Sequence, residues 1–123
     1  LDGDGAALMR MGAFATLGAY GPPNLTHVLL DNGVHDSTGG QATVSPNVSF
    51  AAIAAACGYA SAVDSDDPNV LDEVFAAPAL DGPRFVRLAI KAGAPSDLPR
   101  PTITPVEVKT RLMRHIGVHE SAH

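Results

Sequence analysis

Two short polar motifs, each beside an apolar segment, constrain how this chain can fold. The first is Gly3-Asp4-Gly5, which opens an apolar helix, and the second is Asn32, which ends an apolar strand 28 positions after Asp4. A carboxylate and an amide oxygen are hard ligands of the kind that Mg²⁺ prefers. Glycines let a phosphate approach the backbone, and a helix that starts near Ala6 adds free N–H groups. The pair predicts a magnesium ion that holds a diphosphate.

Two other interpretations of the first motif explain less. Asp2 and Asp4 resemble the start of a calcium-binding EF loop, but Ala6 and Ala13 occupy its next ligand position and its closing glutamate position. A glycine turn with Asp4 as a helix cap accounts for residues 2–6. It leaves the matched asparagine after the later strand unexplained.

Strand and helix patterns alternate along the chain. The run Thr26–Asp31 is apolar without alternation, which is typical of a parallel strand covered on both faces. We expect an α/β domain with a mainly parallel sheet, helices on both faces, and ligands at the carboxyl ends of its strands. Residues 1–5 are expected to be the tail of a strand and its turn, and the other expected strands are 59–63 and 85–90. The expected helices are 6–17, one from Ser49 to Gly58, one from Asp67-Pro68 and one from Thr104.

The same patterns predict the connections and the buried faces. Residues 18–24 are expected to be a connection, and residues 33–47 a long polar loop, which makes that loop a functional candidate. Thr104 to Glu107 form a capping box. The residues expected to face inward are Phe50, Ile53, Ala54 and Cys57, then Val70, Leu71, Val74 and Phe75, and in the last helix Val108, Leu112 and Ile116.

The composition describes a globular domain. The 123 residues are 46% hydrophobic and 17% charged, with a net charge of −5 and scattered basic residues. We therefore expect no nucleic-acid partner. No apolar run is long enough to cross a bilayer, so we expect no membrane partner and a cytoplasmic location. The single cysteine, Cys57, is expected to be a small core residue.

Together the two motifs resemble the thiamine-diphosphate motif, which is Gly-Asp-Gly followed by just under thirty residues and then Asn-Asn. Asp31 stands here in place of the first Asn. Residues 28–41 and 98–108 are similar to the phosphonopyruvate decarboxylases, and the sulfopyruvate decarboxylases come close behind. The resemblance implies thiamine diphosphate and Mg²⁺ as cofactors. It implies Asp4, Asn32 and the carbonyl of Val34 as metal ligands, with Gly3, Gly5 and Ala6 also against the cofactor.

The family implies a non-oxidative decarboxylation, in which 3-phosphonopyruvate gives phosphonoacetaldehyde and CO₂. One alternative is a sulfopyruvate decarboxylase, and another is a different thiamine-diphosphate enzyme, similar to acetolactate synthase. A third is a folded fragment that is not catalytic. The loop directly after Asn32 is expected to meet the substrate's phosphonate or to order a lid. Its alternative is a solvated loop whose hydroxyls bond their own backbone. The candidate substrate residues are His35, Asp36, Ser37 and Thr38.

Members of this family also carry parts that this sequence does not match. A pyrimidine-binding domain, in the same or another subunit, supplies a catalytic glutamate, and Glu73, Glu107 and Glu120 do not match it. We therefore expect residues 1–123 to be a partial C-terminal domain, truncated at its N-terminal side, with 91–123 as a C-terminal connector and helix. The isolated chain is expected to be inactive, and the full-length enzyme to be a homo-oligomer.

The histidines outside the loop have simpler interpretations. His27 precedes the apolar part of a strand and is expected to be structural. His115, His119 and His123 are spaced by four residues, which is compatible with one helical face and a transition metal. Because Gly117 interrupts that helix, incidental surface histidines are favoured.

Overall fold

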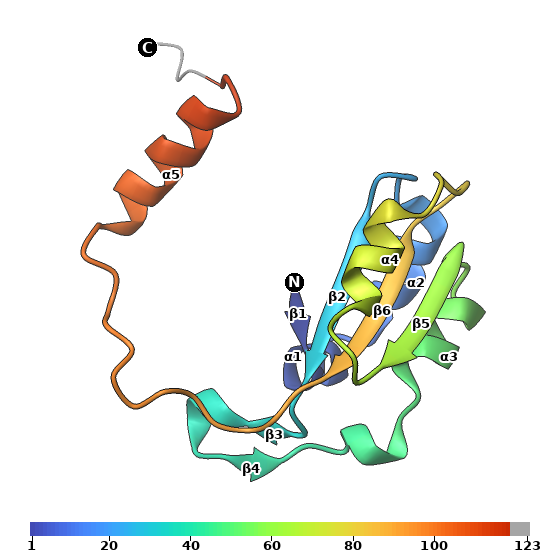
Figure 1. Ribbon diagram of the computed structural model, residues 1–123, viewed down its shortest axis with the longest axis horizontal. Coiled ribbons are helices and arrows are strands. Elements are labelled where there is room, and N and C mark those ends of the chain that lie inside the picture. Colours follow the sequence, from blue (N-terminus) through green and yellow to red (C-terminus); the bar gives the residue numbers. More distant parts are fainter. Residues whose placement is uncertain (119–123) are drawn as a thin grey trace. The chain divides into compact units, whose positions relative to one another are not determined.

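The computed structural model describes residues 1–118, and the chain divides into two units, Leu1–Gly93 and Ala94–His123 (Figure 1). The strands are β1 (Asp2–Gly3), β2 (Thr26–Asp31), β3 (Val34–His35), β4 (Gln41–Ala42), β5 (Ser61–Ser65) and β6 (Arg84–Ala89). The helices are α1 (Asp4–Met9), α2 (Gly12–Tyr20), α3 (Phe50–Ala56), α4 (Val70–Ala76) and α5 (Pro105–His115), and the 3-10 turns are η1 (Asp36–Thr38) and η2 (Ser45–Asn47).

Four strands form one sheet in the order β1-β2-β6-β5, and every neighbouring pair is parallel. The two central strands are apolar on both faces, so that Val28, Leu29 and Val86 are all buried. The predicted parallel sheet is confirmed, and the strand predicted at Thr26–Asp31 has the predicted boundaries. Since the strands are parallel, the chain leaves all four of them at one edge of the sheet.

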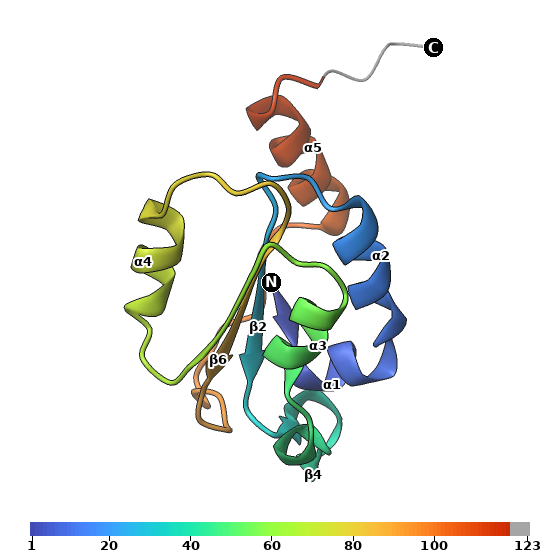
Figure 2. The ribbon, with the colours of Figure 1, turned by 90° about the vertical axis from the view of Figure 1, so that its right-hand side faces the viewer.

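Helices cover both faces of the sheet, with α1, α2 and α3 on one side and α4 on the other (Figure 2). Successive strand residues point to opposite faces, so Phe85 packs with the first group and Val86 with α4. The buried residues of the larger cluster are Ala7, Phe14, Leu29, Phe50, Ala54, Tyr59 and Phe85. Those of the smaller cluster are Val70, Val74, Val86 and Leu88.

A buried histidine ties the short edge strand β1 to the core. Nε2 of His27 lies 3.1 Å from Oδ2 of Asp2, and Nδ1 lies 3.0 Å from the hydroxyl of Tyr59. A carboxylate only accepts hydrogen bonds, so in the neutral ring Nε2 donates to Asp2 and the hydroxyl of Tyr59 donates to Nδ1. Burial, aided by Cys57 and Asp2, raises the pKa of Tyr59 to about 12, so the hydroxyl keeps its proton at neutral pH. This is the structural role predicted for His27.

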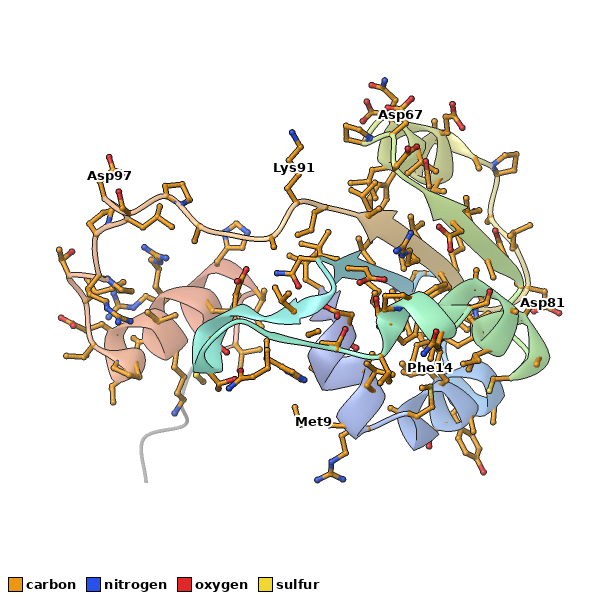
Figure 3. The ribbon with its side chains drawn as sticks, turned by 90° about the horizontal axis from the view of Figure 1, so that it is seen from below. Met9, Phe14, Asp67, Asp81, Lys91 and Asp97 are labelled. Carbon is orange, nitrogen blue, oxygen red and sulfur yellow. The ribbon has the colours of Figure 1, made fainter. Side chains whose placement is uncertain are left out.

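The prediction of one helix over residues 6–17 is wrong, because two helices occupy this segment. The first helix ends where Arg10 adopts φ −130° and ψ 41°, and the second begins at Gly12. The break lets α2 turn its Phe14 into the aromatic cluster, where the ring lies 5.4 Å from Phe85 and 6.3 Å from Phe50 between centroids. In Figure 3, Met9 at the end of α1 points away from the sheet, in keeping with its exposure.

The second helix also runs further than predicted, through residues assigned to a connection. Gly18 lies inside α2, where this helix crosses the end of α3. A Cβ atom on Gly18 would lie 1.8 Å from the carbonyl oxygen of Cys57, so only glycine allows this crossing. Cys57 itself is half-buried and packs against the larger core cluster, which agrees with its predicted core role.

The strand predicted at 59–63 begins two residues later, at Ser61. The reason lies in the end of α3, which Ser49 caps as predicted by accepting a hydrogen bond from the N–H of Ala52. Gly58 has φ +96°, and the N–H of Tyr59 still bonds to the carbonyl of Ala54. Tyr59 is therefore part of the helix terminus rather than of β5.

Helix α4 starts later than its Asp-Pro signal predicted, and one of its side chains faces outward. Asp67 accepts a hydrogen bond from the N–H of Asn69, which precedes the first turn. Val70 and Val74 are buried as predicted, but Phe75 is 64% exposed. At the other end, the buried guanidinium of Arg84 donates to the carbonyls of Val74, Ala77 and Pro78 and caps the helix.

The second unit contains α5, which follows a connector with three prolines. The predicted capping box is present, with the N–H of Thr104 2.7 Å from Oε2 of Glu107 and the N–H of Glu107 3.3 Å from Oγ1 of Thr104. The backbone and hydroxyl hydrogen bonds from Thr104 lower the pKa of Glu107. The prediction that this helix buries Val108, Leu112 and Ile116 is wrong for this chain, because they are 42, 58 and 60% exposed. Among residues 1–118, no helix combines the length and apolar character needed to cross a membrane.

The crossing at Gly18 predicts opposite effects for two substitutions in the same helix. Gly18→Ala places a methyl group against the backbone of Cys57, so we expect the free energy of unfolding to fall by about 3 kcal/mol. Gly12→Ala is the control, because no atom lies within 4 Å of its Cβ position, and it should raise that free energy by about 0.5 kcal/mol. Urea denaturation of both variants measures the difference, and equal stabilities would contradict the crossing.

Candidate functional site

The candidate site lies where β1 and β2 end. Gly3 pairs with Leu30 in parallel register, so Asp4 and the segment from Asp31 onward leave the sheet side by side. The predicted loop at residues 33–47 is more ordered than expected, because it contains the antiparallel pair β3-β4 and both 3-10 turns. This folded hairpin segment brings Thr43 and Ser45 back to the sheet edge, where both are buried.

Asp4 has one carboxylate oxygen engaged and one open. The residue is only 3% exposed, and its Oδ2 accepts a 2.6 Å hydrogen bond from the hydroxyl of Thr43. Its Oδ1 accepts none within residues 1–118. Every fully buried side-chain nitrogen or oxygen of these residues has a partner. Oδ1 is therefore not fully buried and can reach a ligand at the surface.

Asn32 and Val34 present oxygens on a common side. Oδ1 of Asn32 accepts the N–H of Val34 at 3.1 Å, and its Nδ2 donates to Oδ2 of Asp36 at 2.8 Å. The carbonyl of Gly33 accepts the N–H of Thr43 at 2.8 Å. In an antiparallel ladder the main-chain groups of the next residue point the opposite way. The carbonyl of Val34 therefore turns away from β4, toward the side on which its own N–H meets Asn32.

This donor set has the chemistry of a site for a hard divalent cation. It comprises the open carboxylate oxygen of Asp4, the amide oxygen of Asn32 and the carbonyl of Val34, and such oxygens suit Mg²⁺ that keeps phosphate and water as further ligands. Residues 1–118 hold no cluster of three or more His, Cys, Asp or Glu suited to a metal. His115 belongs to α5, whereas His119, Glu120 and His123 lie outside the described residues.

Gly5 has a role that the sequence did not indicate. A Cβ atom at this position would lie 2.6 Å from Nδ1 of His35, so the absence of a side chain makes room for the imidazole ring. The contact brings the first motif and the loop after Asn32 together. Ala6 is exposed in the first turn of α1, and this helix has six residues, so its dipole is smaller than that of the longer helix predicted from sequence.

The other three loop candidates are all exposed, and one of them, Asp36, is anchored by hydrogen bonds. Oδ2 of Asp36 accepts hydrogen bonds from Asn32 and, at 3.0 Å, from the N–H of Gly93, so it joins the ends of β2 and β6. Ser37 and Thr38 are exposed in η1, and the hydroxyl of Thr38 lies 3.4 Å from the carbonyl of His35. The latter contact is the local backbone bond expected for a solvated loop.

Comparison with known families agrees with this geometry. Residues 1–90 match the model of the family described as "Thiamine pyrophosphate enzyme, C-terminal TPP binding domain". The chain belongs to this family.

Several curated members are similar to the chain. It is 53% identical over 113 residues to the phosphonopyruvate decarboxylase of Streptomyces viridochromogenes. This aligned region covers 90% of this chain and 28% of that protein. The chain is 49% identical over 112 residues to the phosphonopyruvate decarboxylase of Streptomyces hygroscopicus, with the same coverage. The sulfopyruvate decarboxylase subunit beta of Methanothermobacter thermautotrophicus is 34% identical over 116 residues, 94% of this chain and 60% of that protein. The chain thus spans less than a third of the two Streptomyces relatives.

Within this TPP-binding domain, sequence reasoning missed the importance of Asp31. Its carboxylate is 2% exposed, and its Oδ2 accepts hydrogen bonds from Nε and Nη2 of Arg87 at 2.9 and 2.8 Å. Its Oδ1 accepts the hydroxyl of Ser45 at 2.6 Å and the N–H of Gly33 at 3.1 Å. Burial disfavours the charged guanidinium, but the hydrogen bonds and charges of Asp31 and Asp64 outweigh it and raise the pKa of Arg87. A charged residue inside the apolar run 85–90 was the available signal.

Removal of Arg87 is therefore expected to destabilise the domain. Arg87→Met keeps the aliphatic stem but leaves Asp31 buried without its counter-charge, which should lower the free energy of unfolding by about 3 kcal/mol. Arg10→Met is the control, because Arg10 is exposed at the end of α1. Thermal denaturation of the two variants provides the measurement. If both melt at the same temperature, the ion pair does not hold this edge of the sheet.

Proposed function

We propose that this chain is the diphosphate- and Mg²⁺-binding part of a thiamine-diphosphate-dependent 2-oxo-acid decarboxylase, which converts 3-phosphonopyruvate to phosphonoacetaldehyde and CO₂. The observation that supports it most is the open oxygen of Asp4. This oxygen belongs to a nearly buried carboxylate at the same sheet edge as Asn32, in a member of the TPP-binding family. A carboxylate in that setting is stabilised by a cation.

In this proposal the three oxygens bind Mg²⁺, which in turn binds the diphosphate. Asp4 contributes Oδ1, Asn32 its amide oxygen and Val34 its carbonyl. The main chain of Gly3, Gly5 and Ala6 would hold the diphosphate. When bound, thiamine diphosphate supplies the electron-accepting ring for loss of CO₂. The domain's own contribution is to hold the charged end of the cofactor in one place, which fixes the position of its reactive end.

The choice of substrate is supported by the relatives. The two Streptomyces proteins at 53 and 49% identity are named phosphonopyruvate decarboxylases, whereas the sulfopyruvate decarboxylase subunits match at 34 and 31%. We keep His35, Ser37 and Thr38 as candidate substrate residues. Asp36 is a weaker candidate, because its charge repels a phosphonate and its Oδ2 already binds Asn32 and Gly93. Sulfopyruvate remains the alternative substrate.

The catalytic glutamate and the pyrimidine-binding domain are proposed to lie elsewhere in the protein or in a second subunit. The name "subunit beta" of two sulfopyruvate decarboxylase relatives is compatible with a division between chains. We also propose a homo-oligomeric, cytoplasmic enzyme.

Replacement of Asp4 tests the cofactor site. In the full-length protein, Asp4→Ala should weaken Mg²⁺-dependent binding of thiamine diphosphate by at least about a hundredfold, since the diphosphate would meet a site without its metal. Asp72→Ala, which removes an exposed carboxylate of α4, is the control. Isothermal titration calorimetry with and without Mg²⁺ measures the affinity. If Asp4→Ala binds thiamine diphosphate as tightly as the unaltered protein does, the assignment of Asp4 fails. If the unaltered protein does not bind thiamine diphosphate either, the chain is a non-catalytic member of the family.

The substrate is tested by steady-state kinetics of the full-length enzyme. We expect kcat/KM to be at least about tenfold higher for 3-phosphonopyruvate than for pyruvate, because the second anionic group supplies binding energy that a methyl group cannot. Sulfopyruvate, compared in the same assay, distinguishes the phosphonate from a sulfonate of similar size. Equal values for phosphonopyruvate and pyruvate would refute the proposed substrate.

A further inference from the structure

Two buried hydroxyls connect the candidate ligand Asp4 to the ion pair of buried Asp31 with half-buried Arg87. The hydroxyl of Thr43 donates to Oδ2 of Asp4 at 2.6 Å and lies 3.3 Å from the N–H of Ser45. The hydroxyl of Ser45 donates to Oδ1 of Asp31 at 2.6 Å. Thr43 and Ser45 are 8 and 5% exposed, so water competes little for these bonds. We call these five residues the hydroxyl relay.

The direction of each hydrogen bond in the relay is fixed by chemistry. A backbone N–H can only donate, so the oxygen of Thr43 must accept from Ser45, and the single proton of Thr43 is left for Asp4. The carboxylate of Asp31 also accepts from Arg87, and a carboxylate only accepts, so the proton of Ser45 points to Asp31. Both hydroxyl protons therefore point toward carboxylates, and neither can turn without losing a buried hydrogen bond.

The relay also holds the residue that follows the second candidate ligand, Asn32. The N–H of Thr43 donates to the carbonyl of Gly33 at 2.8 Å, and the N–H of Gly33 donates to Oδ1 of Asp31. The residue directly after Asn32 is thus held at both of its main-chain groups. One residue, Thr43, therefore contacts the carboxylate of Asp4 through its hydroxyl and the loop after β2 through its backbone N–H.

From these contacts we infer that Thr43 is a positioning residue that turns Oδ1 of Asp4 toward the cation and sets the affinity of the site for Mg²⁺. The inference rests on the proposed function. Thr43 does not itself bind the metal. It occupies Oδ2, and a carboxylate with one oxygen fixed presents the other in one direction. Partners of this kind change metal affinity about 10- to 100-fold in other proteins.

A purely structural role for Thr43 makes different predictions from a positioning role. Valine has the shape of threonine and preserves packing, whereas serine preserves the hydroxyl and loses the methyl group. A positioning role requires that serine retain normal Mg²⁺ affinity and that valine lose it. Ser49→Ala is a matched control, because it removes the hydroxyl that caps α3, which costs stability at a residue outside the relay.

The experiment is an isothermal titration calorimetry measurement. Thiamine diphosphate is titrated into the full-length protein at a series of Mg²⁺ concentrations. For Thr43→Val we expect the half-saturating Mg²⁺ concentration to rise at least about tenfold, with cofactor affinity restored at saturating Mg²⁺. Thr43→Ser and Ser49→Ala should remain close to the unaltered protein. Should Thr43→Val fail to fold, Thr43→Ala removes the same hydroxyl without a branched side chain.

The outcomes separate the inference from the proposed function. If Asp4→Ala abolishes Mg²⁺-dependent binding but Thr43→Val needs no more Mg²⁺ than the unaltered protein, the positioning role is refuted and the proposed function stands. If Thr43→Ser is as impaired as Thr43→Val, packing rather than the hydroxyl matters, and the inference is again wrong. If the unaltered protein shows no Mg²⁺-dependent binding, the proposed function fails and the inference fails with it.

Discussion

Parallel pairing between β1 and β2 is the constraint on which the candidate site depends. The register that places Gly3 beside Leu30 makes both strands end at one level, so that residues far apart in sequence become neighbours. Because β1 has only two residues and lies at the edge of the sheet, its backbone hydrogen bonds are few. The buried contacts of His27 with Asp2 and Tyr59 add the fixation that so short a strand lacks. His27, which is not itself a proposed ligand, therefore helps to fix the strand that leads directly into Asp4.

Two carboxylates are buried at this edge, and the structure compensates their charges differently. A buried carboxylate is costly unless it is paired or well hydrogen-bonded. Asp31 receives a guanidinium, a hydroxyl and a backbone N–H, so its charge is satisfied within the chain. Asp4 receives one hydroxyl and keeps an open oxygen. Asp31 therefore has all the partners it needs within the chain and stabilises this edge of the sheet. Asp4 has fewer partners, and this difference is the physical argument for the proposal that it binds a cation from outside the chain.

The sequence predicted those features whose cause is local, and it failed where the cause is tertiary. Thr26–Asp31 and the capping box at Thr104 were predictable, because an apolar run and a cap need only neighbouring residues. The break at Arg10 was not, since it depends on where Phe14 must enter the core. Spacing indicated that Asp4 and Asn32 would share an edge. The roles of Thr43 and Asp31 required the fold, because their partners lie 39 and 56 residues away.

The distribution of basic residues indicates how an acidic chain is compatible with anionic ligands. Of the four basic residues in residues 1–93, Arg84 caps α4, Arg87 pairs with Asp31 and Asp64, and Arg10 stands at the end of α1 opposite Asp4. The fourth, Lys91, follows β6 at the carboxyl edge and points away from the ribbon in Figure 3. On the proposed function, a cation held by Asp4 would be the main positive charge that this unit offers to a diphosphate. On the same proposal, a substrate phosphonate would be met by Lys91, by the candidate residue His35, by main-chain N–H groups or by groups in another part of the protein. For this reason the domain alone can account for cofactor binding more fully than for substrate choice.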